Sequence, residues 1–275
     1  MDKPFFSIII PTLNEETFLP RLLKDLVAQK EKSFEVIIVD CGSEDRTVIK
    51  AEEFKEKIPL NILTSKIKNV SAQRNAGADN AKGMYLVFYD ADVQIPKNYL
   101  SEIKKYLITH ASPFLTTHIK GDSDHVYDDA IINLLNITGD WSIVIDRPFV
   151  GGYNFIVLKS VFTMIGGFDP KVVHAEDYDL SVRLQHAGYR LTILKEPKLI
   201  FSLRRFRHDG RLSVLRKNSM ASLHVLTQGS IKKDLFSYPM GGMRYQLKKK
   251  DQIQEDVLDR IEKRMKQFLH LFLET

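Results

Sequence analysis

Residues 85–92 read Tyr85-Leu86-Val87-Phe88-Tyr89-Asp90-Ala91-Asp92, an apolar run of strand length that ends in two carboxylates. Alternate side chains of an extended chain point the same way, so Asp90 and Asp92 are expected to converge at the carboxyl edge of a sheet. Carboxylate oxygens in such a pair suit Mg²⁺ or Mn²⁺. An isolated pair with this spacing is more often a polar turn. The surrounding sequence therefore decides whether this pair is a metal site or a polar turn.

The rest of the first hundred residues alternates short β-branched runs with helix-spaced apolar residues, which predicts a mainly parallel sheet covered by helices. The expected strands are 6–10, 35–39, 61–64 and 84–89. Between the first two, apolar residues of 18–27 recur at helical spacing, and Pro20 lies near the helix start, where proline is tolerated. Ser43 and Asp45 are expected to cap a second helix.

Beyond residue 110 the expected elements are a strand at 114–118, a helix near 128–135, a strand near 153–158, a helix over 176–186 and a strand at 190–194. Gly188 is the expected stop of the last helix. In the tail, helical spacing of apolar residues predicts an amphipathic helix that carries Ile253, Val257, Ile261, Met265, Phe268 and Phe272. We therefore expect one catalytic domain at 1–210 and a basic, amphipathic helical extension at 211–275.

The composition excludes a disordered chain, because 44% of the 275 residues are hydrophobic and 27% are charged. The net charge is +5, and a basic cluster follows residue 200: Arg204, Arg205, Arg207, Arg211, Arg216 and Lys217. Such a cluster favours a phosphate-rich partner. Phe206 alone offers too little aromatic surface for nucleic-acid recognition, which uses several stacking sites.

Cysteine usage and hydropathy indicate a cytoplasmic protein. Cys41 is the only cysteine, which excludes an internal disulfide and fits a reducing compartment. The longest apolar runs are far below the roughly 18 residues of a membrane span. The N-terminus does not show the ordered regions of a signal peptide. Any contact with the inner face of the membrane would be peripheral.

Three segments precede the acidic pair: Ser7-Ile8-Ile9-Ile10-Pro11-Thr12-Leu13-Asn14-Glu15, Val39-Asp40-Cys41-Gly42-Ser43-Glu44-Asp45-Arg46-Thr47 and Ala72-Gln73-Arg74-Asn75-Ala76-Gly77. Two follow it: Gly166-Gly167-Phe168-Asp169 and Glu176-Asp177-Tyr178-Asp179-Leu180-Ser181-Val182-Arg183-Leu184. In this order the set resembles glycosyltransferase family 2, with the GT-A fold. The resemblance covers roughly residues 5 to 195, and the ordered set is far more specific than any of its pieces.

The resemblance implies an inverting enzyme that moves a sugar from a nucleotide-sugar donor to an acceptor hydroxyl, with a nucleotide-binding half at 1–110 and an acceptor half at 111–210. The implied donor-binding residues are Pro11, Thr12, Glu15, Asp40, Arg74, Asp90 and Asp92; the implied acceptor-binding residues are Gly167, Phe168, Glu176 and Arg183. Asp92, beside Asp90, would be the more direct ligand of a divalent cation, Mn²⁺ or Mg²⁺. His208 and His174 are candidate further ligands.

The sequence departs from the family pattern in the segment that would recognise the nucleobase. The family commonly has paired aspartates where this sequence has Asp40-Cys41, and a cysteine does not replace a carboxylate acceptor.

The resemblance also makes Asp177 the catalytic base. Asp177, Leu180 and Leu184 fall at i, i+3 and i+7 of the expected helix, so the carboxylate shares a face with core leucines and points inward. Acidic residues in a first helical turn also occur simply as partners of the helix dipole. Arg183 would orient acceptor or diphosphate, or form a helical salt bridge. Residues 204–211 would close over the diphosphate, bind a phosphorylated acceptor, or form a solvated basic face.

Other function classes remain open at this point. A sugar-phosphate nucleotidyltransferase also uses acidic metal ligands, but it usually opens with a glycine-rich loop that ends in a basic residue, and residues 7–15 contain neither glycine nor lysine. A noncatalytic sugar- or lipid-binding protein on a decayed transferase fold is another alternative. A dinucleotide-dependent oxidoreductase is disfavoured, since no G-x-G-x-x-G follows the first strand. The expected acceptor is a sugar or a lipid-linked group. The tail helix would pack on the domain, on a second subunit or on a membrane.

Overall fold

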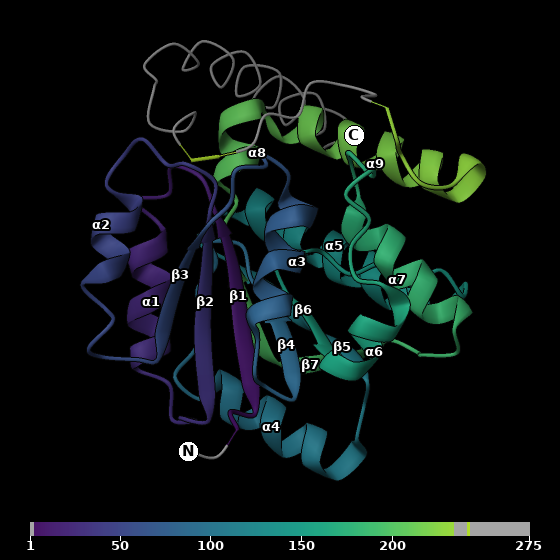
Figure 1. Cartoon of the computed structure of the whole chain (residues 1–275). Coiled ribbons are helices and arrows are strands. Elements are labelled where there is room, and N and C mark those ends of the chain that lie inside the picture. Colours follow the sequence, from purple (N-terminus) through teal and green to yellow (C-terminus); the bar gives the residue numbers. More distant parts are fainter. Residues whose placement is uncertain (1–2, 234–240, 243–275) are drawn as a thin grey trace.

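A seven-stranded sheet forms the centre of the computed structural model, which describes residues 3–233 and 241–242 (Figure 1). Within these residues the strand order is β3-β2-β1-β4-β6-β5-β7. The strands are β1 (Phe6–Thr12), β2 (Phe34–Asp40), β3 (Leu60–Thr64), β4 (Tyr85–Phe88), β5 (Phe114–Gly121), β6 (Phe155–Leu158) and β7 (Thr192–Phe201). The helices are α1 (Leu19–Val27), α2 (Thr47–Glu52), α3 (Val70–Asn80), α4 (Tyr99–His110), α5 (Val126–Val144), α6 (Lys159–Ile165), α7 (Glu176–His186), α8 (Arg204–Asp209) and α9 (Arg211–Gln228).

The sheet is mostly parallel, as the alternating pattern predicted. β1 pairs in parallel with β2 and β4, and β5 with β7, whereas β6 runs antiparallel to both β4 and β5. Ile8 and Ile10 of β1 face α1 and α4, while Ile9 faces α3, α6 and α7. Burial on both faces explains why the central strands are continuous apolar runs.

Several elements differ from their predicted bounds. α5 runs to Val144 instead of ending near residue 135, because apolar residues recur throughout it. β7 continues through Pro197 to Phe201 instead of ending at residue 194, and it tolerates proline because it lies at the sheet edge. The sequence did not predict α3, whose buried face carries Ser71, Gln73 and Arg74 instead of an apolar stripe.

The predicted cap of the second helix is partly wrong. α2 begins at Thr47, and Asp45 Oδ1 accepts a hydrogen bond from the Thr47 N–H at 2.9 Å. The Ser43 hydroxyl instead donates to Asp40 and accepts the Asn14 N–H at 2.8 Å. Ser43 therefore joins the ends of β1 and β2.

The chain after residue 210 begins with α9, which packs on α5. Val214 lies in the same core cluster as Ile131 and Ile132, and Arg211 Nη2 is 3.1 Å from Asp128 Oδ1. The division at 210 stays a prediction. The predicted tail helix with Ile253, Val257, Ile261, Met265, Phe268 and Phe272 lies outside the described residues. Of the helices within 3–233, none combines the length and apolar character needed to cross a membrane.

Gly83, between α3 and β4, packs against the backbone of β1 and gives a first prediction. A Cβ at this position would lie 2.6 Å from the Ser7 nitrogen and 2.7 Å from the Phe6 carbonyl carbon. Because a central strand cannot easily move, we expect Gly83→Ala to lower the free energy of unfolding by roughly 1–3 kcal/mol in urea denaturation. Gly139→Ala is the control, since its Cβ would meet only Ile193 Cδ1 at 3.6 Å. Equal stability of the two variants would contradict this packing.

Candidate active site

The carboxyl ends of β1 and β2 form one wall of the site. Thr12 Oγ1 donates to Asp40 Oδ1 at 3.1 Å, and Asp40 Oδ2 accepts the N–H groups of Gly42 and Ser43 at 3.0 and 2.9 Å. Gln73 of α3 donates to the carbonyls of Thr12 and Val39. These bonds hold Asp40 in one orientation beside the loop that follows β1.

Arg204, the first residue of α8, joins the β1 loop to the acidic pair after β4. Its Nη1 and Nη2 donate to the two Glu15 oxygens at 2.7 and 2.6 Å, and its Nε lies 2.7 Å from Asp92 Oδ2. Burial raises the pKa of Glu15 to about 7, although Arg204 opposes the shift. Burial likewise raises the pKa of Asp92, again against Arg204. Arg204 is thus the counterion of two carboxylates whose side chains are only 7% and 15% exposed.

Arg74 of α3 makes the second link, between the acidic pair and α7. Its side chain is 3% exposed. Its Nη2 lies 3.0 Å from Asp90 Oδ1 and its Nη1 lies 2.6 Å from Glu176 Oε1. The guanidinium also lies 5.3 Å from the ring centroid of Phe168. One buried arginine therefore connects the strand end that carries Asp90 with the first turn of α7.

Asp177 lies beside this link, in the first turn of α7. Its Oδ2 accepts the Gly152 N–H at 2.6 Å and its Oδ1 accepts the Tyr178 N–H at 2.8 Å. Burial, with Glu176 adding negative charge, raises the pKa of Asp177 to about 7, and Arg74 opposes the shift. A helix N-terminus lowers the pKa of a nearby carboxyl group, but here burial outweighs that effect. A carboxylate with such a pKa is matched to proton abstraction near neutral pH.

Residues with a positive φ lie next to α7 and in the loop after β1. Ala175, directly before α7, has φ +57°, and Asn14, in the loop after β1, has φ +56°. Asparagine tolerates the left-handed region better than alanine does, because its side chain can bond locally. In this structure Asn14 Oδ1 accepts the N–H of Glu44, which is 30 positions away along the chain, at 2.8 Å. Strained residues of this kind cluster at functional sites.

Two contributors were not singled out from the sequence. Gly152 supplies the N–H for Asp177 and lies against Arg74, since a Cβ there would be 2.2 Å from Arg74 Nη2. The adjacent glycines Gly151 and Gly152, just before a strand, were the available signal. Arg204 belonged to a basic stretch that was treated as a whole. Its partner Glu15 is 189 positions away, so pattern alone could not pair them.

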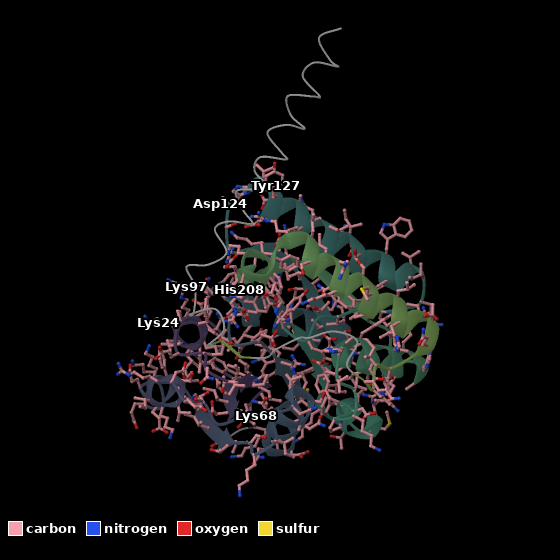
Figure 2. The ribbon with its side chains drawn as sticks, turned by 90° about the horizontal axis from the view of Figure 1, so that it is seen from above. Lys24, Lys68, Lys97, Asp124, Tyr127 and His208 are labelled. Atoms are coloured by element: carbon pink, nitrogen blue, oxygen red, sulfur yellow. The ribbon has the colours of Figure 1, made fainter. Side chains whose placement is uncertain are left out.

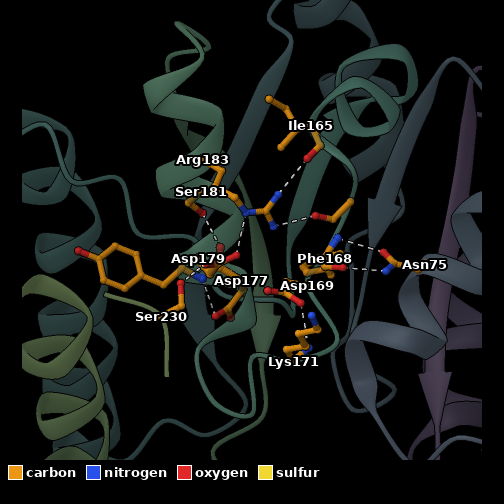
Figure 3. Close-up of polar contacts among 12 residues, drawn as sticks. Asn75, Ile165, Phe168, Asp169, Lys171, Asp177, Asp179, Ser181, Arg183 and Ser230 are labelled. Carbon is orange, nitrogen blue, oxygen red and sulfur yellow. Dashed lines mark hydrogen bonds and ion pairs between the residues drawn. The ribbon is translucent and has the colours of Figure 1, made fainter. Parts of the chain in front are cut away.

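Arg183 of α7 reaches from the helix toward Ile165 and the loop that carries Phe168 (Figure 3). Arg183 donates to Asp179 Oδ2 at 2.8 Å and to the carbonyls of Ile165 and Gly167 at 3.1 and 2.7 Å. Phe168 is 1% exposed, and its N–H donates to Asn75 Oδ1 at 3.0 Å. Arg183 thus makes the helical salt bridge that was one of its two expected roles. The acceptor contacts of Gly167, Phe168 and Arg183 stay predictions.

The carboxylates of the site suit a divalent cation that would also bind the oxygens of a diphosphate. Across the described ranges, no three His, Cys, Asp or Glu side chains are arranged to hold a metal. His208 and His174 therefore belong to no such group within these ranges, and His208 Nδ1 instead lies 2.7 Å from Asp209 Oδ1. The site gathers the carboxylates of Glu15, Asp90, Asp92, Glu176 and Asp177 around Arg74 and Arg204. This excess of hard, negatively charged oxygens suits Mg²⁺ or Mn²⁺.

Comparison with known proteins finds glycosyltransferases. The amylovoran biosynthesis glycosyltransferase AmsB of Erwinia amylovora is 28% identical over 259 residues, which cover 85% of this chain and 81% of AmsB. TarS of Staphylococcus aureus, a poly(ribitol-phosphate) β-N-acetylglucosaminyltransferase, is 33% identical over 122 residues, which cover 42% of this chain but 21% of TarS.

Two solved structures share the fold. TarS 1–349 in complex with UDP-GlcNAc has a TM-score of 0.58 at 24% identity, over 72% of this chain and 58% of that one. The mannosyltransferase PcManGT of Pyrobaculum calidifontis, in complex with GDP-Man and Mn²⁺, has a TM-score of 0.61 at 18% identity, over 80% and 65%. At these identities the likeness shows a shared GT-A fold. The sequence model of glycosyl transferase family 2 matches residues 7–163, more than half of the chain. The chain belongs to glycosyl transferase family 2.

Proposed function

We propose that the protein transfers a sugar from a nucleoside-diphosphate sugar to an acceptor hydroxyl with inversion, using Asp177 as the general base. One observation carries this proposal: Arg74 joins the acidic pair to the helix that holds a carboxylate with a pKa of about 7. A donor group and a base for the acceptor would then lie on the two sides of one guanidinium. TarS with UDP-GlcNAc and PcManGT with GDP-Man support the donor class.

The donor would lie along the carboxyl ends of β1, β2 and β4. Pro11, Thr12, Glu15 and Asp40 would line the nucleotide pocket, and Arg74 would contact the nucleotide. Asp92 and Asp90 would hold a divalent cation, Mn²⁺ or Mg²⁺. When bound there, the cation supplies positive charge to the diphosphate leaving group. Its presence in the PcManGT complex supports this assignment.

The chemical step would be a single displacement. Each Asp177 oxygen accepts one backbone N–H, and a carboxylate oxygen has a second acceptor position, so Asp177 can still receive the acceptor hydroxyl proton. As that proton leaves, the acceptor oxygen bonds to the anomeric carbon and the bond from that carbon to the diphosphate oxygen breaks. Attack from the face opposite the leaving group inverts the configuration. The backbone donors of Gly152 and Tyr178 fix the carboxylate during the transfer.

The remaining assignments complete the proposal. Gly167, Phe168, Glu176 and Arg183 would shape the acceptor region, with 1–110 as the nucleotide-binding half, 111–210 as the acceptor half and 211–275 as the extension. The acceptor would be a sugar or a lipid-linked group. The protein would work in the cytoplasm or at the inner face of the membrane, and residues 253–272 would pack on the domain, a second subunit or a membrane.

Titration calorimetry tests the donor and cation assignment. With UDP-GlcNAc and GDP-mannose as probes, we expect one donor to bind in Mn²⁺ and its affinity to fall on the order of a hundredfold with a chelator, because the diphosphate loses its counterion. Asp92→Ala should cause a comparable loss. Asp140→Ala, on α5, is the control and should bind normally. Undiminished donor affinity in chelator and in Asp92→Ala would remove the cation from the proposal.

A further inference from the structure

Helix α5 exposes an apolar stripe that the active site does not use. The α5 stripe consists of Leu134, Ile137, Trp141 and Val144, whose exposed fractions are 49%, 53%, 62% and 74%. Their spacing of three, four and three residues places them along one side of the helix. Single exposed apolar residues are normal, but a contiguous apolar patch marks an interaction surface.

The part of α5 that carries the stripe has almost no charge. Between residues 130 and 145 the only ionisable side chain is Asp140, and its Oδ1 lies 2.9 Å from His118 Nε2. The neighbouring Ile143 and Ile145 are also exposed, by 40% and 56%. The surface therefore lacks the interspersed charges of an ordinary solvated helix.

Helix α9 lies beside α5 and adds positive charge. Figure 2 shows the two helices together on one side of the molecule, with Tyr127 at the start of α5, and Arg211 of α9 pairs with Asp128 of α5. α9 contains Arg211, Arg216 and Lys217 but no aspartate or glutamate. Its exposed apolar residues are Leu212, Met220 and Leu223. The two helices thus combine an apolar stretch of α5, whose only ionisable side chain between residues 130 and 145 is Asp140, with a basic helix.

We propose that α5 and α9 dock on an anionic lipid bilayer, with Trp141 in its interfacial layer. Peripheral membrane binding is stable when an apolar insertion and a basic patch act together, and both signals are present here. Tryptophan is favoured at the membrane interface because its ring is apolar and its N–H is polar. A symmetric pairing of two copies through this surface would place the basic side chains of the two α9 helices against each other. This repulsion favours lipid phosphate as the partner.

The docking surface lies next to the donor site, and this part of the inference rests on the proposed function. Arg204, which holds Glu15 and Asp92, begins α8, and α9 follows after Gly210. α8 has six residues and is therefore only about 9 Å long. A bilayer bound at α5 and α9 would therefore lie next to the carboxylates of Glu15 and Asp92. The acceptor hydroxyl would accordingly belong to a lipid-linked group.

Trp141 is the only tryptophan in the chain and reports the docking directly. The full chain would be mixed with phosphatidylcholine vesicles that contain or lack phosphatidylglycerol. We expect the Trp141 emission to shift to the blue, and acrylamide quenching to fall, only when phosphatidylglycerol is present. Ile137→Asp and Val144→Asp should each weaken vesicle binding roughly tenfold, because a charge replaces inserted apolar surface. Arg216→Gln should weaken it roughly fivefold.

Ile108→Asp is the matched control, since Ile108 is 68% exposed but lies on α4, and its vesicle binding should equal that of wild type. Thermal melts would establish that each variant is folded. Wild-type vesicle binding by Ile137→Asp and Val144→Asp would overturn the proposal and assign any membrane contact to another segment, such as residues 243–275. A dimer without vesicles that Ile137→Asp dissociates would overturn it in favour of a second copy.

Donor binding separates this inference from the proposed function. Ile137→Asp should bind the donor as wild type does while losing vesicle affinity. If wild-type protein binds vesicles but no nucleotide sugar, the proposed function fails and the docking stands. If it binds a nucleotide sugar but no anionic vesicle, the docking is wrong.

Discussion

Asp177→Asn is expected to abolish sugar transfer while donor affinity stays within a few-fold of wild type. The substitution keeps the size of the side chain and an oxygen that can accept the Gly152 N–H, but it removes the proton acceptor. General-base catalysis contributes on the order of 10²- to 10⁴-fold, so kcat should fall by that factor. Nucleoside diphosphate release gives kcat, and calorimetry gives the donor Kd. Asp79→Asn, at an exposed position on α3, serves as the control and should keep the wild-type kcat.

The pH profile tests the same assignment. Burial favours the protonated form of Asp177, so the base is charged only above its raised pKa, and wild-type activity should fall as pH drops below about 7. Glu176→Gln removes a neighbouring negative charge, which lowers the pKa of Asp177 and should move this limb to lower pH. Asp177→Asn should lose the limb. An unchanged acid limb in Asp177→Asn, or transfer close to wild type, would eliminate Asp177 as the base.

Arg74→Met is expected to cause a large loss of stability together with loss of activity. The substitution removes the buried partner of Glu176 and Asp90, and it leaves Asp177 without its nearby positive charge. Glu176, which is 14% exposed, then remains as an unpaired and largely buried charge, and breaking a buried ion pair in this way costs about 3–5 kcal/mol; Asp90 is 43% exposed and stays hydrated. Urea denaturation measures the loss. Arg46→Met, at an exposed position before α2, should stay within about 0.5 kcal/mol of wild type.

A double substitution separates the two consequences of losing Arg74. Glu176→Gln removes the carboxylate that Arg74→Met leaves unpaired, so Arg74→Met with Glu176→Gln should regain part of the stability. It should regain no activity, because the link from Asp90 to α7 stays broken. A double variant no more stable than Arg74→Met would show that the buried pair is not the source of the loss.

The fold was largely predictable because parallel strands buried on both faces are continuous apolar runs. β1, β2 and β4 were found in this way, and the acidic pair after β4 marked the edge of the sheet where the site lies. α3 was not found, because its buried side carries Gln73 and Arg74, which bond to strand ends and carboxylates instead of packing as apolar side chains. Polar burial of this kind has no hydrophobic period to detect.

The sequence predicted candidate site residues but not the contacts between them. Residue types and order indicated Asp177 as a base, yet its raised pKa depends on burial and on Glu176, which compete with Arg74. Arg204 and Gly152 act through contacts between distant segments, and each contact depends on how the chain folds. The sequence therefore predicted Asp90, Asp92, Asp177 and Arg74 as site residues, while the ion pairs that Arg74 and Arg204 form became clear only from the structure.

Release of nucleoside diphosphate from a panel of UDP-, GDP- and dTDP-sugars, each with Mn²⁺, Mg²⁺ or chelator, tests the central claim most directly. The acceptor need not be known, because slow transfer to water also releases the nucleotide. We expect release from donors of one nucleotide class with a divalent cation, loss of release with chelator, and loss in Asp177→Asn. Release that persists unchanged with chelator and in Asp177→Asn, or no release from any donor by the folded protein, would contradict it.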